Sequence, residues 1–361
     1  MLVLPCGHGP HPLSDRYVLV LAGGRGERFW PWSRPERPKQ LLPLAPGGRS
    51  LLAATLDRAA RVVPHDHVLV LTARDLVGAV RRECPAGVEV IGEPVGRNTA
   101  PAIGAAAARF LGHSPSAAFA VMPSDHLIED GVAFAADLER AFTIAERERV
   151  LLTFGIPPTH PEVNFGYIRR GAPVGERLHR VAQFTEKPDL ARARAWVAGG
   201  DHSWNAGIFV WSAASFLDAL EATRPALAGP LRALSGAGER FGERLDAVFP
   251  SLESISVDYA VLEHAPNVLV LDASFDWDDL GSWGAWARRQ ARDARGNVRF
   301  GDTVVVDCDG CVVVGDGGTA AALGLREMVV VHANGSTLAC PLDRTEQVRR
   351  VSEALRERGG T

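Results

Sequence analysis

The chain has 361 residues, of which 46% are hydrophobic and 23% are charged, and its formal net charge is −4. This balance is typical of a globular protein and argues against the broad basic surface that binds nucleic acid or acidic membranes. No apolar run is long enough to cross a bilayer, and residues 1–16 lack a basic region followed by an apolar core. We therefore expect no membrane span and no signal peptide.

Strand-like and helical segments alternate along the first part of the chain. Strands are predicted at residues 17–24, 67–73, 117–126 (which runs on into a loop) and 150–156, and helices at residues 50–63, 99–112 and 134–148. This alternation predicts a mostly parallel sheet covered by helices, with ligands beyond the carboxyl ends of the strands.

The pattern changes after residue 292, where short strands such as DTVVVDCDGCVVVGD and LREMVVVHANG are separated by Gly, Asp and Asn turns. The segment RTEQVRRVSEALRER predicts a closing helix over residues 344–358. We therefore predict a poorly ordered extension at 1–16, a large α/β domain at 17–292 and a small β-rich domain at 293–361.

The five cysteines are an odd number for a disulfide framework, and they fit a reducing cytoplasm better than an oxidising compartment. Cys308 and Cys311 form a lone Cys-x-x-Cys pair inside a strand-like run. A metal or redox role for this pair is disfavoured because no second pair follows at zinc spacing.

The chain has 39 Lys and Arg residues in total, and only Lys39 and Lys187 among them are lysines. Lysine carries a compact ammonium on a thin stem, whereas arginine carries a planar fork. The two lysines are therefore candidates for sites where a point charge must fit a tight space. The alternative is that they are chance remnants in an arginine-biased sequence.

Glycines follow the first predicted strand, in the segment LAGGRGERF. Gly23, Gly24 and Gly26 let backbone N–H groups approach a phosphate without obstruction by side chains. The spacing matches neither the dinucleotide fingerprint nor a Walker A loop. Two cations, Arg28 and Lys39, follow the glycines and suit a polyphosphate whose transition state needs its charge neutralised. A tight turn with surface arginines is the alternative interpretation.

Eight blocks in order resemble the sugar-nucleotide pyrophosphorylases, most closely the branch of mannose-1-phosphate guanylyltransferases. The blocks are LAGGRGERFWPWSRPERPKQLL, IGEPVGRNTAPAIGAA, VMPSDHLI, NFGYI, FTEKPD, SWNAGIFVW, SVDYAVLE and WDDLGSW, and the resemblance covers roughly residues 17–345. It implies a Rossmann-like three-layer α/β/α nucleotidyltransferase domain with a mixed, mostly parallel sheet. It also implies a small C-terminal β-rich domain that is partly left-handed β-helix-like.

The resemblance further implies a reaction between GTP and mannose 1-phosphate that yields GDP-mannose and pyrophosphate. The sugar phosphate would attack the α-phosphorus of GTP in line. Because this nucleophile is already an anion, no general base is needed, and catalysis should consist of positioning and of cations that offset charge repulsion. A homodimer and a cytoplasmic location are further expectations.

The resemblance assigns roles to residues within the blocks. Arg28 would steady the departing pyrophosphate, and Lys39 would lie over the α-phosphate. The nucleotide-binding residues implied are Leu21, Ala22, Gly23, Gly24, Gly26, Glu93, Arg97, Asn98, Thr99, Pro123 and Ser124. Asn98 and Thr99 also suit the cap of the following helix, which is an alternative explanation for both.

The sugar phosphate would meet the middle blocks. The implied residues are Gly166, Tyr167, Glu186, Lys187, Asn205, Ala206, Gly207 and Asp258. Carboxylates and amides suit hydroxyl groups because each can fix two hydrogen bonds, and Lys187 suits the phosphate. A surface ion pair is the alternative for Glu186 and Lys187.

Mg²⁺ would be held by Asp125 and Asp279, since this ion usually takes one or two carboxylates together with phosphates and water. Asp276 and Asp278 lie next to Asp279 and leave the choice within this cluster open, and turn formation is the alternative role for these aspartates. His126 is expected to be structural because no proton needs to move.

Other features bear on the limits of the resemblance. Core packing is expected for the tryptophans Trp204, Trp211, Trp277, Trp283 and Trp286, with stacking on the sugar as the alternative. Leu342 stands where the family often has a lysine, so a contact made by that lysine is absent. Bifunctional relatives carry a further isomerase domain for which this sequence has no room, and we expect no isomerase activity.

Three rival functions remain at this stage. The first is the same chemistry on another nucleotide or hexose 1-phosphate. The second is a non-catalytic subunit that binds sugar nucleotides, which the retention of the cations and carboxylates disfavours. The third is a dinucleotide-binding oxidoreductase, which is disfavoured because Phe29 replaces the third glycine and no acidic residue ends the second strand.

Overall fold

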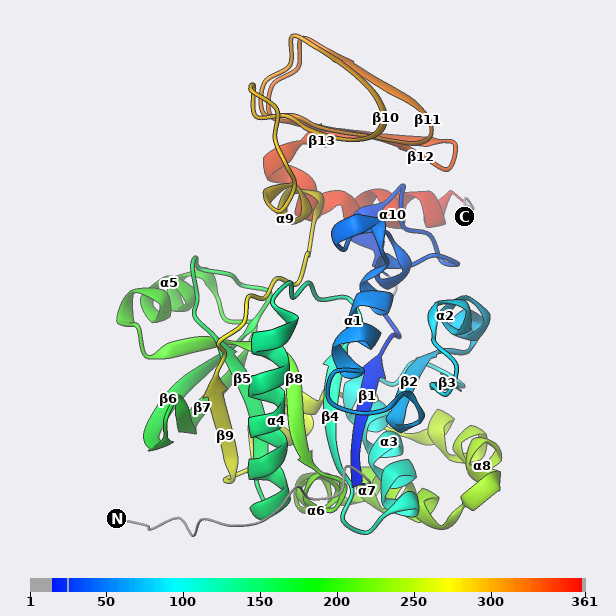
Figure 1. The fold of residues 1–361 in the computed structure, drawn as a ribbon, viewed down its shortest axis with the longest axis vertical. Helices are drawn as coiled ribbons and strands as arrows, with labels where there is room; N and C mark the ends of the chain where they lie inside the picture. The colour runs from blue at the N-terminus through cyan, green and yellow to red at the C-terminus, as the bar shows by residue number, and fades with distance from the viewer. Residues whose placement is uncertain (1–14, 25, 359–361) are drawn as a thin grey trace.

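The computed structural model describes residues 15–24 and 26–358 (Figure 1). All but the last two residues of the predicted extension at 1–16 lie outside the described residues. The first strand, β1 (Arg16–Leu21), begins at Arg16 and leads into the glycine segment.

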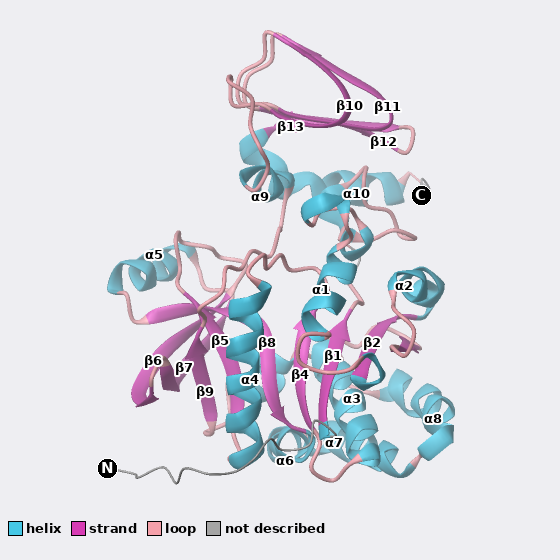
Figure 2. Ribbon diagram, viewed as in Figure 1, coloured by secondary structure: helices cyan, strands magenta, loops and turns pink. Residues whose placement is uncertain are grey.

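A nine-stranded mixed sheet forms the centre of the larger domain (Figure 2). Pairings show that β7 and β8 run against the other seven strands, which share one direction. In spatial order the strands are β3 (Glu89–Glu93), β2 (Val68–Ala73), β1, β4 (Ala118–Pro123), β8 (His202–Ser212), β5 (Leu151–Ile156), β9 (Val268–Asp272), β7 (Leu178–Glu186) and β6 (Gly166–Gly175).

Helices cover both faces of this sheet. One face packs against α3 (Thr99–His113), α6 (Ala213–Thr223), α7 (Pro225–Arg232) and α8 (Phe241–Val248). The other packs against α1 (Leu51–Ala59), α2 (Val77–Glu83), α4 (Gly131–Arg147) and α5 (Leu190–Gly199). Successive residues of β1 alternate between the two cores, as the period of a strand requires. The predicted three-layer α/β/α domain with a mixed, mostly parallel sheet is confirmed.

The second sheet consists of β10 (Val298–Val306), β11 (Val312–Leu323), β12 (Met328–Ala333) and β13 (Ser336–Pro341). The first three are parallel although only short turns join them, so successive stretches of chain stack as coils (Figure 2). The coils approach closely: a Cβ atom on Gly301 would lie 2.0 Å from the carbonyl oxygen of Gly315. This stacking confirms the predicted β-rich, β-helix-like domain.

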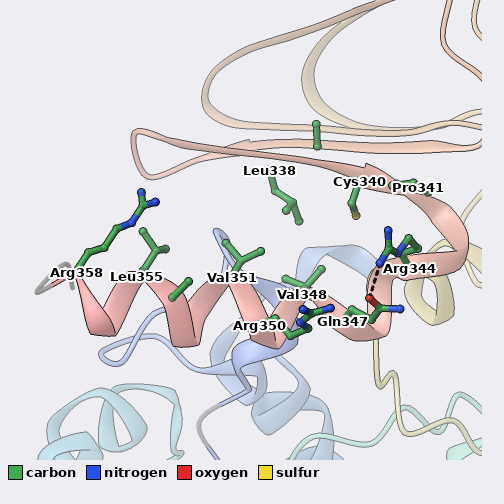
Figure 3. Close-up of a pocket in the computed structure, with 12 residues that line it drawn as sticks. Leu338, Cys340, Pro341, Arg344, Gln347, Val348, Arg350, Val351, Leu355 and Arg358 are labelled. Carbon is green, nitrogen blue, oxygen red and sulfur yellow. Dashed lines mark hydrogen bonds between the residues drawn. The ribbon is translucent and has the colours of Figure 1, made fainter.

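The closing helix is shorter than predicted. Residues 342–348 form a 3₁₀ segment, and the α-helix α10 spans Arg349–Glu357. The Thr345 hydroxyl donates to the Leu342 carbonyl and accepts from the Gly284 N–H, and such local bonds compete with α-helical ones. The helix lies beside β13, and the side chains of Val351, Leu355 and Leu338 point into the groove between them (Figure 3).

The two domains share a core rich in tryptophan. Trp32, Trp283 and Trp286 are at most 1% exposed and pack with valines of the second sheet. The Trp32 indole N–H also donates to Asp316 of β11, with 2.6 Å between nitrogen and oxygen. Trp283 and Trp286 belong to α9 (Trp283–Arg288). The segment after the glycine loop is therefore anchored on the second domain.

The prediction that the remaining tryptophans pack in the core holds for two of the three. Trp204 and Trp211 are at most 5% exposed, whereas Trp277 is half-buried.

We expect Trp283→Ala to lower the free energy of unfolding by about 3–5 kcal/mol, because it removes a fully buried aromatic side chain from the shared core. Guanidinium unfolding followed by circular dichroism measures this loss. Leu323→Ala, at a side chain that is 71% exposed, is the control and should change stability by less than about 0.5 kcal/mol. Equal effects of the two substitutions would contradict the shared core.

Candidate active site

Lys39 lies at the centre of the site. Its ammonium donates to Asp125 Oδ2 at 2.9 Å and to the main-chain carbonyl of Asp279, and the residue is 7% exposed. Asp125 follows β4, and Asp279 lies in the segment between β9 and α9. One cation therefore joins three segments that are far apart in sequence.

The glycine loop fits closely against Lys39. Gly26 has a φ of 57°, and a Cβ atom there would lie 2.4 Å from the Cβ of Lys39, so no larger residue fits. The buried Gln40 side chain donates to the carbonyls of Ala22 and Gly24, at 2.7 and 2.9 Å. These contacts fix the loop whose N–H groups are candidates for phosphate binding.

Asp125 and Asp279 differ in their electrostatic surroundings. Burial would raise the pKa of Asp125, but the charge of Lys39 and the hydrogen bond from Lys39 outweigh it, so this pKa is lowered. Burial raises the pKa of Asp279 to about 6, and the charges of Asp278 and Asp125 add to this effect while Lys39 opposes it. Asp125 and Asp279 would hold a divalent cation, whose charge would offset this repulsion.

The side chains of Asp276 and Asp278 make other contacts. Asp276 accepts from the N–H groups of Glu129 and Asp130, and Asp278 forms an ion pair with Arg289 at 3.2 Å. Asp279 has fewer competing contacts, since among the described residues its carboxylate accepts a hydrogen bond only from the Gly281 N–H. Of the three aspartates, Asp279 is therefore the better candidate to bind a metal ion together with Asp125.

His126 has a structural environment. Its Nδ1 accepts from the Trp277 indole N–H at 3.1 Å, which requires an unprotonated Nδ1. Burial lowers the pKa of this imidazole to about 4. The neutral ring therefore supports the loop beside Asp125, in agreement with the structural role expected for it.

The residues predicted to bind the nucleotide lie at the ends of β1, β3 and β4 and at the start of α3. The Asn98 side chain accepts from the Thr99 N–H at 2.8 Å, and the Thr99 hydroxyl accepts from the Val257 N–H at 2.9 Å. Arg97 donates to the carbonyl of Pro250. Helix capping and contacts within the loops therefore explain the positions of these three side chains without a ligand. The Glu93 carboxylate instead lies near the glycine loop, since a Cβ atom on Gly23 would be 4.0 Å from Glu93 Oε2.

The residues predicted to bind the sugar phosphate form a second group, named the sugar-side cluster. The Asn205 amide donates to Asp258 at 3.2 Å, and a Cβ atom on Gly166 would lie 2.6 Å from Glu186 Oε2 and 3.4 Å from the Cβ of Asn205. Lys187 forms an ion pair with Glu186 at 2.8 Å. Burial, followed by the charge of Glu186, raises the pKa of Asp258 to about 7. The cluster therefore concentrates acceptors suited to sugar hydroxyls.

Other predicted residues contribute backbone or packing. Tyr167 is 1% exposed and its hydroxyl accepts from the Glu162 N–H, so its ring is turned away from the sugar-side cluster. Ala206 is fully buried. Gly207, with a φ of 67°, lies between the two clusters, since a Cβ there would be 3.6 Å from both His126 and Pro123. Ser124 and Leu21 are joined by a main-chain hydrogen bond of 3.0 Å.

Two supporting residues were missed at the sequence level. Gln40 follows Lys39 directly, and nothing in the sequence showed where its amide points. Arg58 is 4% exposed and donates to the carbonyls of His126 and Ile128, both at 3.2 Å, so it fixes the loop that carries Asp125. The available signal was the position of Arg58 in the predicted helix at 50–63. It lies on the same face as Leu51 and Thr55, so a charged side chain falls on the face expected to be buried.

Comparison with known proteins identifies the family of this chain. Residues 17–295 match the model of the nucleotidyl transferase family, and residues 301–355 match that of the MannoseP isomerase/GMP-like beta-helix domain. The chain belongs to the nucleotidyl transferase family. It is therefore an enzyme of that family, with an α/β nucleotidyltransferase domain and a β-helix domain.

Several relatives are similar over most of the chain. The xanthan biosynthesis protein XanB of Xanthomonas campestris is 37% identical over 96% of this chain and 74% of its own length. A mannose-1-phosphate guanylyltransferase of Escherichia coli is 34% identical over 94% of this chain and 74% of its own length. A crystal structure from Thermus thermophilus, described as mannose-1-phosphate geranyltransferase, has a TM-score of 0.86 at 37% identity and covers 95% of this chain and 99% of its own.

Within residues 15–24 and 26–358, no helix is long and apolar enough to span a membrane. Over the same residues, no group of three or more His, Cys, Asp or Glu side chains is arranged to hold a metal ion. Two carboxylates are nevertheless the usual protein contribution to a Mg²⁺ site that also uses phosphates and water, so Asp125 and Asp279 fit that ion.

We expect Lys39→Arg to reduce turnover roughly 100-fold or more, because a planar fork cannot replace the ammonium between Asp125 and Asp279 beside Gly26. Steady-state release of pyrophosphate measures the loss, and circular dichroism verifies folding. Arg37→Lys, the reverse exchange at an exposed position of the same segment, is the control and should be neutral. Near-normal turnover of Lys39→Arg would refute the requirement for a compact cation.

Proposed function

We propose that this nucleotidyltransferase joins GTP and α-D-mannose 1-phosphate to form GDP-mannose and pyrophosphate. The contact of the Lys39 ammonium with Asp125 and Asp279, between the glycine loop and the sugar-side cluster, carries this proposal. The names of the relatives at 34–37% identity support the choice of substrates.

The reaction needs charge compensation rather than proton transfer. Lys39 would offset charge on the α-phosphate, and the glycine loop would bind the remaining phosphates through its N–H groups. Arg28 donates to the Gly281 carbonyl at 3.4 Å and lines a cavity of about 460 Å³ that also contains Asp279. This position suits a cation that steadies the departing pyrophosphate.

Asp125 and Asp279 would hold Mg²⁺, which when bound neutralises phosphate charge. On the other side of the site, Glu186 and Asp258 would accept hydrogen bonds from sugar hydroxyls, and Asn205 would fix Asp258. Lys187, whose side chain is 59% exposed, would bind the phosphate of mannose 1-phosphate. The sugar phosphate would thus be presented to the α-phosphorus without a general base.

Two further expectations stay predictions. One is a homodimer. The other is a cytoplasmic location, with which the free thiols of Cys84, Cys308, Cys311 and Cys340 are compatible.

The substrates can be tested with a panel of nucleoside triphosphates. Purified protein, Mg²⁺ and mannose 1-phosphate are incubated with GTP, ATP, UTP, CTP or dTTP, and pyrophosphate release is followed. We expect release with GTP to be much faster than with the other four. Preference for another nucleotide would overturn the substrate, and no release with any nucleotide or hexose 1-phosphate would favour the non-catalytic binder.

We expect Asp125→Ala to abolish Mg²⁺-dependent activity while leaving the chain folded, because it removes one of the two carboxylates available to the ion. Pyrophosphate release over a Mg²⁺ titration and a thermal melt measure the two effects. Asp75→Ala removes an exposed carboxylate and is the control. If Asp125→Ala kept its activity, the metal would have to be held elsewhere.

A further inference from the structure

We propose that the groove between β13 and α10 binds a short segment of a partner protein, in which apolar residues are flanked by acidic ones. This proposal concerns the second domain and does not rest on the proposed function.

The groove is apolar along its length. Its volume of about 620 Å³ lies in the range of ligand-binding clefts. Figure 3 shows Leu338 of β13 opposite Val351 and Leu355 of α10, with all three side chains directed into the groove. Every residue of α10 is at least partly exposed, so Val351 and Leu355 still present apolar surface to water. A ligand that covered them would remove this surface from water, which favours binding.

The charges on the groove are all of one sign. Arg344, Arg350 and Arg358 line it, and no acidic residue of the described chain does. Figure 3 shows Arg358 at one end of the groove and Arg344 at the other. Arg344 donates to the neutral amide of Gln347 at 3.0 Å, and none of the three arginines forms an ion pair among residues 15–24 and 26–358. The groove therefore offers three cations to an external anion.

Other arginines of the same helix already have an acidic partner. On another face of α10, Arg356 and Arg349 form ion pairs with Glu27, at 3.0 and 3.6 Å. The net charge of the chain is −4, so the positive charge at the groove is local and does not belong to a generally basic surface. Charge complementarity therefore requires an acidic occupant.

The edge of the second sheet favours an extended occupant. β13 is the last strand of its sheet, and within the described chain it pairs only with β12. The outward main-chain groups of an edge strand can pair with an added segment. A segment bound along β13 would lie in the groove, because α10 runs beside this strand (Figure 3). Its apolar residues would contact Leu338, Val351 and Leu355, and its acidic ends would meet Arg344 and Arg358.

Two other occupants match the groove less well. A second copy of this chain, joined groove to groove about a twofold axis, would bring the arginines of both copies together, and like charges repel. An anionic membrane surface would match the arginines. The apolar side chains, however, lie between two elements and not on a projecting face that could enter a bilayer. A narrow acidic and apolar segment satisfies both the charge and the shape.

The probe is a fluorescein-labelled peptide, Glu-Glu-Val-Leu-Val-Leu-Glu-Glu, whose binding is followed by fluorescence anisotropy. One control peptide has lysines in place of the glutamates, and another has serines in place of the apolar residues. We expect the probe to bind at least about tenfold more tightly than either control, because it alone matches both features of the groove. Hydrogen exchange should become slower in β13 and α10 when the probe is bound, which locates the site.

Charge reversal provides the matched variants. The double variant Arg344→Glu, Arg358→Glu should bind the acidic probe at least about tenfold more weakly and prefer the lysine peptide, a gain that a folding defect cannot imitate. The control double variant is Arg82→Glu, Arg194→Glu, which changes the net charge equally at exposed positions of α2 and α5 and should bind the probe as the wild type does.

Three results would overturn the proposal. The first is equal binding of the acidic and lysine peptides by the wild type, or equal binding of the probe by the wild type and the groove variant. The second is binding of phosphatidylglycerol vesicles that the groove variant loses, without binding of the probe, since the groove would then belong to a membrane surface. The third is a dimer that only the groove variant fails to form, which would assign the groove to a second copy of the chain.

Discussion

The site depends on one buried cation. The Lys39 ammonium contacts the Asp125 carboxylate and the Asp279 carbonyl, and so holds the loop after β4 against the segment that precedes α9. A buried charge is favourable only when it is paired and hydrogen-bonded, so these contacts fix its position. The glycine loop can approach it because Gly26 has no side chain. Phosphates on that loop would therefore meet a cation already in place, and little reorganisation would be needed when charge develops on them.

The second domain contributes to this arrangement, although none of the predicted site residues lies in it. The segment between Gly26 and Leu51 packs through Phe29, Trp32 and Leu42 into the core shared with the β-helix. The Asn334 amide donates to the Pro31 carbonyl at 2.9 Å, and Arg34 donates to the Asn334 carbonyl. The loop that carries Lys39 is thus supported by two domains. Loss of the β-helix would free Lys39 as well as expose the tryptophans.

Much of the fold followed from the sequence because it is encoded locally. Alternating apolar runs predicted the strands and helices, and the ordered blocks predicted both domains. What could not be predicted depends on contacts between distant segments. The roles of Gln40 and Arg58 arise from carbonyls of other segments, which periodicity does not reveal. The 3₁₀ segment at 342–348 departs from its helical pattern because Thr345 contacts α9, which lies some sixty positions earlier in the chain. Similarly, sequence alone could not decide between Asp276, Asp278 and Asp279, whereas their contacts distinguish them.

Three carboxyl groups of the site share a raised pKa, which suits the site to binding ligands. Burial raises the pKa of Glu93, Asp258 and Asp279 to values between about 6 and about 7, so each lies where its charged form is costly. In the proposed function they would lie on the nucleotide, sugar and metal sides of the phosphates, respectively. Each expected ligand would remove that cost in its own way: the nucleotide through hydrogen-bond donors, the hexose through its hydroxyls and the divalent cation through its charge. The cost of burying all three charged carboxylates would be removed only when all three ligands are bound. Correct substrates would therefore gain binding energy that incomplete or mismatched ones would not.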